Sequence, residues 1–76
     1  MARPLYEIAS EIRRDWKNIS PYARPYLQAM SCLESIEDNY IYDSGRSIVA
    51  YFLANAGTWR GETAKRIKAE LRAMSK

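Results

Sequence analysis

The sequence predicts an all-α fold, a small bundle of about four short helices with the third helix central. Near both ends of the chain, apolar residues recur at three- and four-residue spacing, as they do on one face of a helix. Between these stretches, residues 48–54 contain a single polar side-chain atom, a tyrosine hydroxyl. A helix that is apolar nearly all round belongs inside a bundle. The connections are short, so residues 1–76 are expected to form one domain.

The first half of the chain predicts two helices separated by a turn. The first spans about residues 4–17, with Pro4 in its first turn, where the missing N–H of proline is harmless. Its expected buried face is Leu5, Ile8, Ala9, Ile12 and Trp16. The second begins near Pro25, because a proline deeper inside a helix loses a hydrogen bond, and ends around Asp38 and Asn39. Its expected buried face is Tyr26, Ala29, Met30, Leu33 and Ile36.

The second half predicts two more helices. Asp43 or Ser44 is expected to cap a third helix that runs to about Ala56, and Gly57 suits its end. One stripe of small residues would let another helix approach closely; it consists of Ser47, Ala50, Ala54 and Gly57. Thr58 is expected to cap the last helix. The expected buried face of that helix is Trp59, Thr63, Ile67, Leu71 and Met74.

Charge is distributed unevenly along the chain, whose formal net charge is +3. Residues 19–45 carry one basic and four acidic groups, whereas residues 60–76 carry six basic and two acidic groups. The chain is therefore not uniformly basic, as many nucleic-acid-binding proteins are, and not acidic enough to mimic DNA.

Cysteine and histidine usage indicates a cytoplasmic protein. Cys32 is the only cysteine, which excludes an intrachain disulfide and a cysteine-based zinc site. A reducing compartment fits this composition. No apolar run approaches the ~20 residues that cross a bilayer, and residues 1–4 lead directly into a helix pattern without a signal-peptide core. We expect no membrane association.

The residue types that catalysis requires are poorly represented. The chain has no histidine, so the usual general base is missing and the lone thiol has no imidazole to activate it. The carboxylates of Glu7 and Glu11 fall on the polar side of a helix, which is typical of a solvated face. Residues 37–45 lack the ligand spacing of a calcium-binding loop, and three separate glycines form no phosphate-binding loop. We expect a non-enzymatic protein without a cofactor.

Tyrosines in or next to the connections form a candidate protein-binding surface. Tyr22, Tyr40 and Tyr42 lie where full burial is difficult, and exposed aromatic residues beside charged ones are typical of interfaces. The candidate partner-binding residues are Tyr40, Tyr42, Asp43, Arg46 and Arg60. The alternative is that these tyrosines pack over the ends of a small core. The same surface would also serve a homodimer.

Two groups of basic residues are candidates for binding nucleic acid. At ~100° per residue, the basic residues of the last helix share a stripe about 80° wide, almost opposite its apolar face. That stripe consists of Lys65, Lys68, Arg72 and Lys76. Arg13, Arg14 and Lys17 form a second cluster on the first helix, and adjacent helices would merge the two into one cationic surface. The alternative, which we favour, is that these residues simply solubilise amphipathic helices. The exposed face of the last helix offers mostly lysine and glutamate, which contact phosphate or water rather than bases.

Several stretches resemble a family of short proteins of phages, prophages and other mobile elements of bacteria. These stretches are residues 4–9, 15–18, 42–53, 58–62 and 67–71. They span nearly the whole chain but contain no diagnostic catalytic motif. The resemblance implies a protein that binds a host complex, such as an inhibitor of a CRISPR or restriction system, in the host cytoplasm. The alternative function is a small basic accessory protein that binds nucleic acid.

Overall fold

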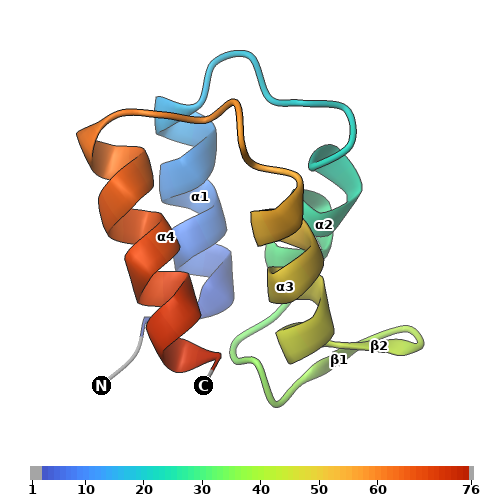
Figure 1. Ribbon diagram of the computed structural model, residues 1–76. Coiled ribbons are helices and arrows are strands. Elements are labelled where there is room, and N and C mark those ends of the chain that lie inside the picture. Colours follow the sequence, from blue (N-terminus) through green and yellow to red (C-terminus); the bar gives the residue numbers. More distant parts are fainter. Residues whose placement is uncertain (1–2, 76) are drawn as a thin grey trace.

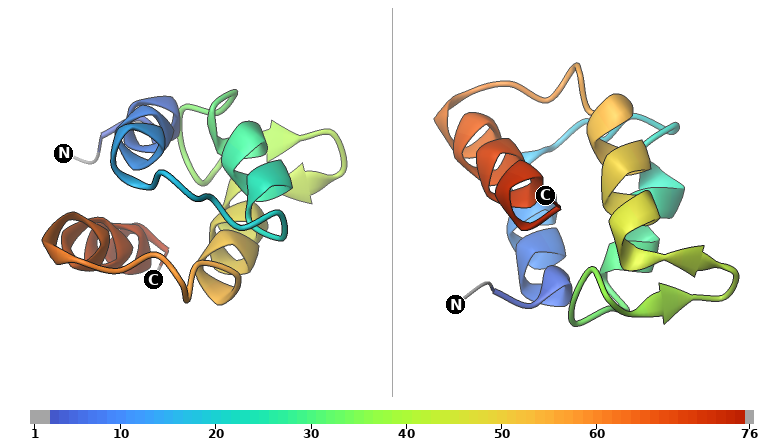
Figure 2. Two further views of the ribbon diagram at one scale, coloured as in Figure 1. Left: turned by 90° about the horizontal axis from the view of Figure 1, so that it is seen from above. Right: turned by 60° about the horizontal axis from the view of Figure 1, so that its bottom comes forward.

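The computed structural model describes residues 3–75, which form four helices and one two-stranded hairpin. In chain order the elements are α1 (Leu5–Asp15), α2 (Arg24–Met30), β1 (Asn39–Tyr40), β2 (Asp43–Ser44), α3 (Gly45–Ala54) and α4 (Glu62–Met74). Helix α1 packs against both α2 and α4, and α3 lies against α2 (Figure 1). The mostly helical fold is confirmed. The hairpin was not predicted, and it projects from the helical body beside the start of α3 (Figure 2).

The predicted buried face of α1 is confirmed, since its apolar residues are all inaccessible to solvent. These residues are Leu5, Ile8, Ala9 and Ile12. Pro4 is the N-cap rather than the first helical residue, and the helix ends at Asp15. Trp16 follows the last turn and is also buried. A helical pattern therefore located the helix well but extended it slightly at both ends.

Helix α2 is much shorter than predicted, because the segment that follows it makes hydrogen bonds to the start of α1 instead of continuing the helix. The helix ends at Met30 instead of Asp38 or Asn39. The main-chain carbonyls of Leu33 and Glu34 accept hydrogen bonds of 2.9 Å from the N–H groups of Tyr6 and Leu5. These are first-turn N–H groups of α1, which have no partner within their own helix. A contact between distant parts of the chain thus ends α2 early.

The third helix is not enclosed on all sides, which corrects the prediction that it is central. Ile48, Val49 and Phe52 are buried, but Tyr51 is 51% exposed and Ala50 is also exposed. The small-residue stripe therefore faces partly outward. The physical reason is that α4 packs on α1, so too few elements remain to surround α3. The predicted cap at Ser44 is confirmed, because its Oγ accepts a hydrogen bond of 3.1 Å from the N–H of Ser47.

Helix α4 begins at Glu62, later than its predicted cap at Thr58. Its N-cap is Gly61 with φ of 115°, a conformation that residues other than glycine rarely adopt. Residues 55–61 cross between the ends of α3 and α4 (Figure 1). Trp59 is buried within this connection rather than on the helix. The buried residues of the helix itself are Ala64, Ile67 and Leu71.

A network of ion pairs joins α1 to α4 and is built on Arg3. The guanidinium of Arg3 binds both carboxylate oxygens of Glu70, at 3.0 and 2.8 Å, and lies 2.8 Å from the carboxylate of Glu11. Arg66 pairs with the same Glu11 carboxylate. Hydrogen bonds from Arg3 and then Arg66 lower the pKa of Glu11 below its ordinary value. The ionised form of Glu11 therefore stabilises the packing of α1 on α4.

Replacing Gly45 by alanine is expected to destabilise the fold. A Cβ at Gly45 would lie 2.7 Å from the carbonyl oxygen of Ser35 and 2.8 Å from the Cα of Ile36. Both are main-chain atoms, so the backbone must shift, and we expect a loss of about 2 kcal/mol in the free energy of unfolding. Urea denaturation measures it. Gly57→Ala is the matched control, because its Cβ would meet nothing within 4 Å; equal losses would contradict the account.

The contribution of Glu11 to stability is expected to depend on pH. Because folding lowers its pKa, the stabilisation is fully present above the unfolded value of about 4.3 and disappears as pH falls through the folded value. Thermal or urea unfolding of wild type and Glu11→Gln should therefore differ most near pH 7 and converge as pH falls from about 5 towards 3. A difference that stays constant over this range would contradict the assignment.

Candidate functional site

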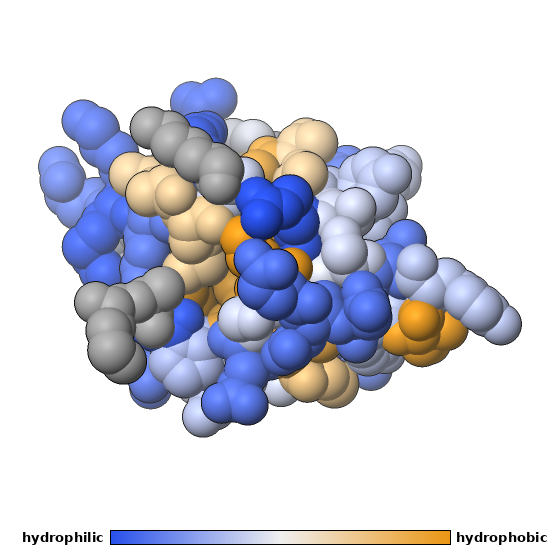
Figure 3. Space-filling model, turned by 90° about the horizontal axis from the view of Figure 1, so that it is seen from below, coloured by the Kyte–Doolittle hydropathy of each residue, from blue (hydrophilic) through white to orange (hydrophobic). Residues whose placement is uncertain are grey.

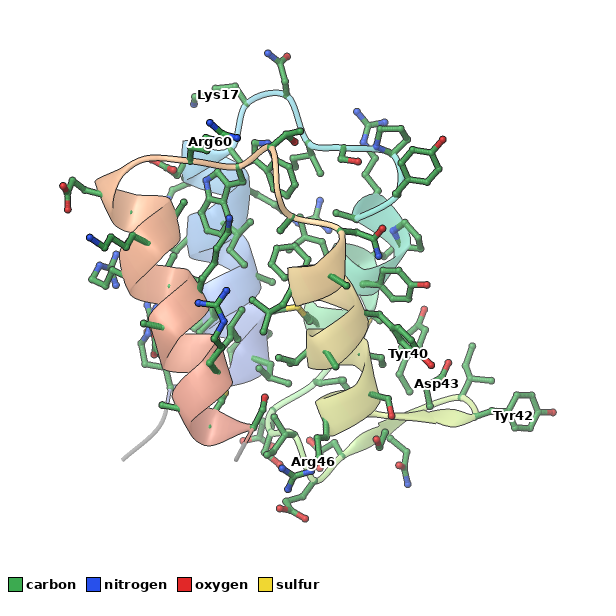
Figure 4. The ribbon with its side chains drawn as sticks, in the orientation of Figure 1. Lys17, Tyr40, Tyr42, Asp43, Arg46 and Arg60 are labelled. Carbon is green, nitrogen blue, oxygen red and sulfur yellow. The ribbon has the colours of Figure 1, made fainter. Side chains whose placement is uncertain are left out.

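The structure brings four of the five predicted partner-binding residues together at one end of the molecule. Tyr40, Tyr42 and Asp43 belong to the hairpin, and Arg46 lies near its base (Figure 4). Arg60 lies at the opposite end, in the connection between α3 and α4. The predicted site is therefore a hairpin site without Arg60.

The hairpin ends in two exposed apolar residues, Ile41 and Tyr42, which we call the hairpin tip. The strands β1 and β2 pair antiparallel, with Asn39 opposite Ser44 and Tyr40 opposite Asp43. Ile41 and Tyr42 alone connect them and are 76% and 98% exposed. Figure 3 shows an isolated hydrophobic patch on this projecting arm. Large apolar side chains this exposed gain nothing from the protein's own core.

The backbone at the tip is strained. Ile41 has φ of 57° and is the only non-glycine residue between 3 and 75 with a positive φ. Glycine, asparagine and aspartate are the residues that usually adopt a positive φ in two-residue hairpin loops. For a β-branched residue this conformation is a clear outlier and costs about 1–2 kcal/mol. Neither burial nor backbone preference explains isoleucine at this position.

The base of the hairpin, in contrast, is firmly held. Tyr40 is partly buried and packs against the core. The N–H of Gly45 donates to the carbonyl of Asp38 at 2.6 Å. Arg46 donates from Nη1 to the carbonyl of Ser75 at 2.6 Å, and its Nη2 lies 3.6 Å from the carboxylate of Glu37. Tyr40 and Arg46 therefore fix the hairpin rather than present a free surface.

Sequence reasoning missed Ile41, which the structure places at the centre of the candidate site. Residues 39–44 read Asn-Tyr-Ile-Tyr-Asp-Ser, in which β-branched and aromatic residues stand between residues typical of turns. That composition is the usual signal of a short hairpin. The segment is too short for the signal to be strong, and no glycine marks the turn.

The two predicted basic clusters come together only in part: Lys17 lies at the same end of the molecule as Arg60 (Figure 4), whereas Arg13 and Arg14 lie away from the basic stripe of α4. On α1, Arg13 donates to the Ser31 hydroxyl at the end of α2, at 3.2 Å, and Arg14 lines a shallow hollow together with Thr63 of α4. Residues two positions apart on a helix point ~200° apart, so Thr63 and Lys65 face opposite flanks of α4. Arg14 therefore approaches one flank of α4, where Arg66 pairs with Glu11, and Lys65 occupies the other.

Cations of α4 and of the preceding connection line a second hollow of about 310 Å³. We call it the cationic cleft, and its basic residues are Arg60, Lys65, Lys68 and Arg72. Lys68 is only partly exposed, and its Nζ donates to the carbonyl of Trp59 at 2.6 Å. Burial first, and then Arg72 and Arg60, lower the pKa of Lys68. Lys76 lies outside the described residues.

Within residues 3–75, no helix is long and apolar enough to cross a membrane. The same part of the chain contains no group of three or more histidine, cysteine, aspartate or glutamate side chains placed to hold a metal ion. Comparison with protein families, with characterised proteins and with solved structures finds no match to this chain. The interpretation of function therefore depends on the geometry of the hairpin tip and the cationic cleft.

Replacing Ile41 by asparagine is expected to stabilise the protein. Asparagine tolerates a positive φ far better than a β-branched residue, and little buried apolar area is lost at a side chain that is 76% exposed. We expect a gain of about 1 kcal/mol in the free energy of unfolding, measured by urea denaturation. A loss of stability would contradict the conclusion that Ile41 is strained and contributes little to the core.

Proposed function

We propose that this protein is a non-enzymatic interaction protein that binds a protein partner through the hairpin tip. The observation that carries the proposal is the combination of exposure and strain at Ile41 and Tyr42. Strained backbone persists where the surrounding structure imposes it, and it concentrates at binding and catalytic sites. Tyrosine is among the residues that dominate binding energy at interfaces.

The magnitudes favour the tip as an anchor rather than a complete interface. A large aromatic side chain buries about 150–250 Å², which at ~25 cal/mol per Å² corresponds to roughly 4–6 kcal/mol before the cost of association. That cost alone is about 4–15 kcal/mol. Stable binding therefore requires further contacts around the tip, and the exposed carboxylates of Asp43 and Asp38 are the nearest polar candidates along the chain.

We propose a host defence complex as the target, of the CRISPR or restriction type, with the protein acting as an inhibitor in the bacterial cytoplasm. The support for this target is the resemblance to short proteins of phages and mobile elements. The hairpin fits such a role because a projecting apolar tip can enter a concave site of a larger assembly. The alternative, nucleic-acid binding over one merged basic surface, is disfavoured because Arg13 and Arg14 of α1 lie away from the basic stripe of α4.

Replacing Tyr42 by alanine is expected to abolish partner capture without affecting folding. The side chain is 98% exposed, so we expect the free energy of unfolding to change by less than about 0.5 kcal/mol. Immobilised wild type, Tyr42→Ala and Tyr22→Ala are compared as baits in lysate of the bacterial host, with quantitative mass spectrometry. Tyr22 is also exposed, at 75%, but lies outside the hairpin. A partner lost equally from both variants would contradict the proposal.

The inhibitor role has its own test in cells. Phage plaquing efficiency is measured in strains with active CRISPR or restriction systems, with and without the protein. Expression of the wild type and Tyr22→Ala is expected to restore plaquing in at least one strain, whereas Tyr42→Ala is not. If a partner is captured through Tyr42 but plaquing is not restored in any strain, the hairpin tip remains the binding site and the proposal of a host defence target is wrong.

A further inference from the structure

We propose that the cationic cleft binds a phosphate group, either of a small phosphate-bearing anion or of a nucleic-acid backbone. The cleft runs along one side of α4 from the connection before it to its last turn, and its cations come from residues 60–72. The hairpin tip is at the opposite end of the molecule, as the positions of Arg60 and Tyr42 in Figure 4 show. The two sites are therefore independent.

The charges of the cleft have no internal counterpart. Within the described part of the chain, Arg60, Lys65 and Arg72 form no ion pair. On the other flank of α4, Arg66 pairs with Glu11 and Glu70 pairs with Arg3. The fold therefore balances charge on the flank that faces α1 and leaves an uncompensated positive potential on the other.

The cations are close enough to affect one another, and one of them is held in place. Arg72 and Arg60 disfavour the charged form of Lys68 and so contribute to its lowered pKa. The Lys68 ammonium cannot swing away freely, because it donates to the Trp59 carbonyl and lies 5.8 Å from the centroid of the Trp59 ring. An anion in the cleft would reduce the repulsion between Lys68 and the two arginines, and the Lys68 ammonium is already held in place to receive it.

The chemistry of the cleft suits phosphate rather than a nucleobase. Arginine presents a planar set of donors that matches phosphate oxygens, and lysine adds a point charge. A hollow of about 310 Å³ has room for a phosphate or a pyrophosphate. Trp59 lines the cleft but is only 2% exposed, so it offers no open ring face on which a base could stack. Recognition is therefore expected to be independent of base sequence.

The test uses two probes, inorganic pyrophosphate and a fluorescein-labelled dT12 oligonucleotide, each at low salt. Amide chemical shifts of the ¹⁵N-labelled protein report where pyrophosphate binds, and fluorescence anisotropy reports oligonucleotide binding. The site variant is Arg60→Gln/Arg72→Gln. The control is Arg13→Gln/Arg14→Gln, which removes the same charge from residues of α1 that do not line the cleft, so that both lower the formal net charge from +3 by two. Urea unfolding of both confirms that they fold.

Binding of at least one probe is expected, with shifts concentrated in the residues that line the cleft, which lie between 59 and 72. The site variant should weaken that binding about tenfold or more, because hydrogen bonds to a charged group are lost, and the control should weaken it less than about threefold. Binding of pyrophosphate alone identifies a small anion, and binding of dT12 alone identifies a nucleic-acid backbone. The proposal is overturned if neither probe binds at low salt, or if the control loses as much affinity as the site variant.

Discussion

Two stacked indole rings hold the ends of three helices together. Trp16, just after α1, and Trp59, just before α4, lie with ring centroids 5.6 Å apart and planes 11° apart. Phe52 of α3 meets the edges of both rings, at centroid distances of 6.2 and 6.3 Å. Such aromatic pairs contribute about 0.5–1.5 kcal/mol each beyond the area they bury. In a chain of 76 residues, whose core is small, these contacts are a large part of what fixes the helices relative to one another.

The polar atoms of Trp59 extend this constraint to the surface. Its indole N–H donates to the Asp15 carboxylate at 2.8 Å, so the buried ring leaves no donor unsatisfied. Its main-chain carbonyl accepts a hydrogen bond from the Lys68 ammonium, which fixes the position of that cation in the cationic cleft. The hairpin is fixed separately, through Gly45 and Arg46 at the other end of α3. Both candidate sites therefore stand on a rigid body, which reduces the entropy lost on binding.

Local patterns predicted those parts of the fold that depend on neighbours in sequence. The apolar spacing of Leu5, Ile8 and Ile12 located α1. Ser44 was one of the two residues predicted to cap α3, because a capping hydroxyl bonds an N–H only three residues further along the chain. The end of α2 could not be predicted in this way. The carbonyls of Leu33 and Glu34 accept hydrogen bonds from N–H groups of α1, about 28 residues earlier in the chain, and a local pattern carries no information about that contact. The periodicity of apolar residues also does not predict which helices pack together, such as α4 on α1, or that α3 is partly exposed.

The candidate sites were predictable to a similar extent. Tyr42 and Asp43 could be selected from residue type and position, whereas Ile41 became notable only through its exposure and positive φ. Lys65 and Arg72 were placed correctly on one exposed stripe. Arg60 was grouped with the hairpin residues, whereas the path of residues 55–61 places it beside Lys68 at the opposite end of the molecule. The sequence therefore indicated which residue types the candidate sites contain better than it indicated which residues lie together.

The most direct test of the proposed partner-binding surface is site-specific photo-crosslinking in bacterial cells that contain an active CRISPR or restriction system. Benzoylphenylalanine replaces Tyr42 in one protein and Tyr22 in another, and both are irradiated in living cells. The account predicts one discrete covalent adduct with a protein from position 42 and none from position 22. Adducts of equal yield from both positions, or an adduct from position 22 alone, would show that the hairpin tip is not the partner-binding surface.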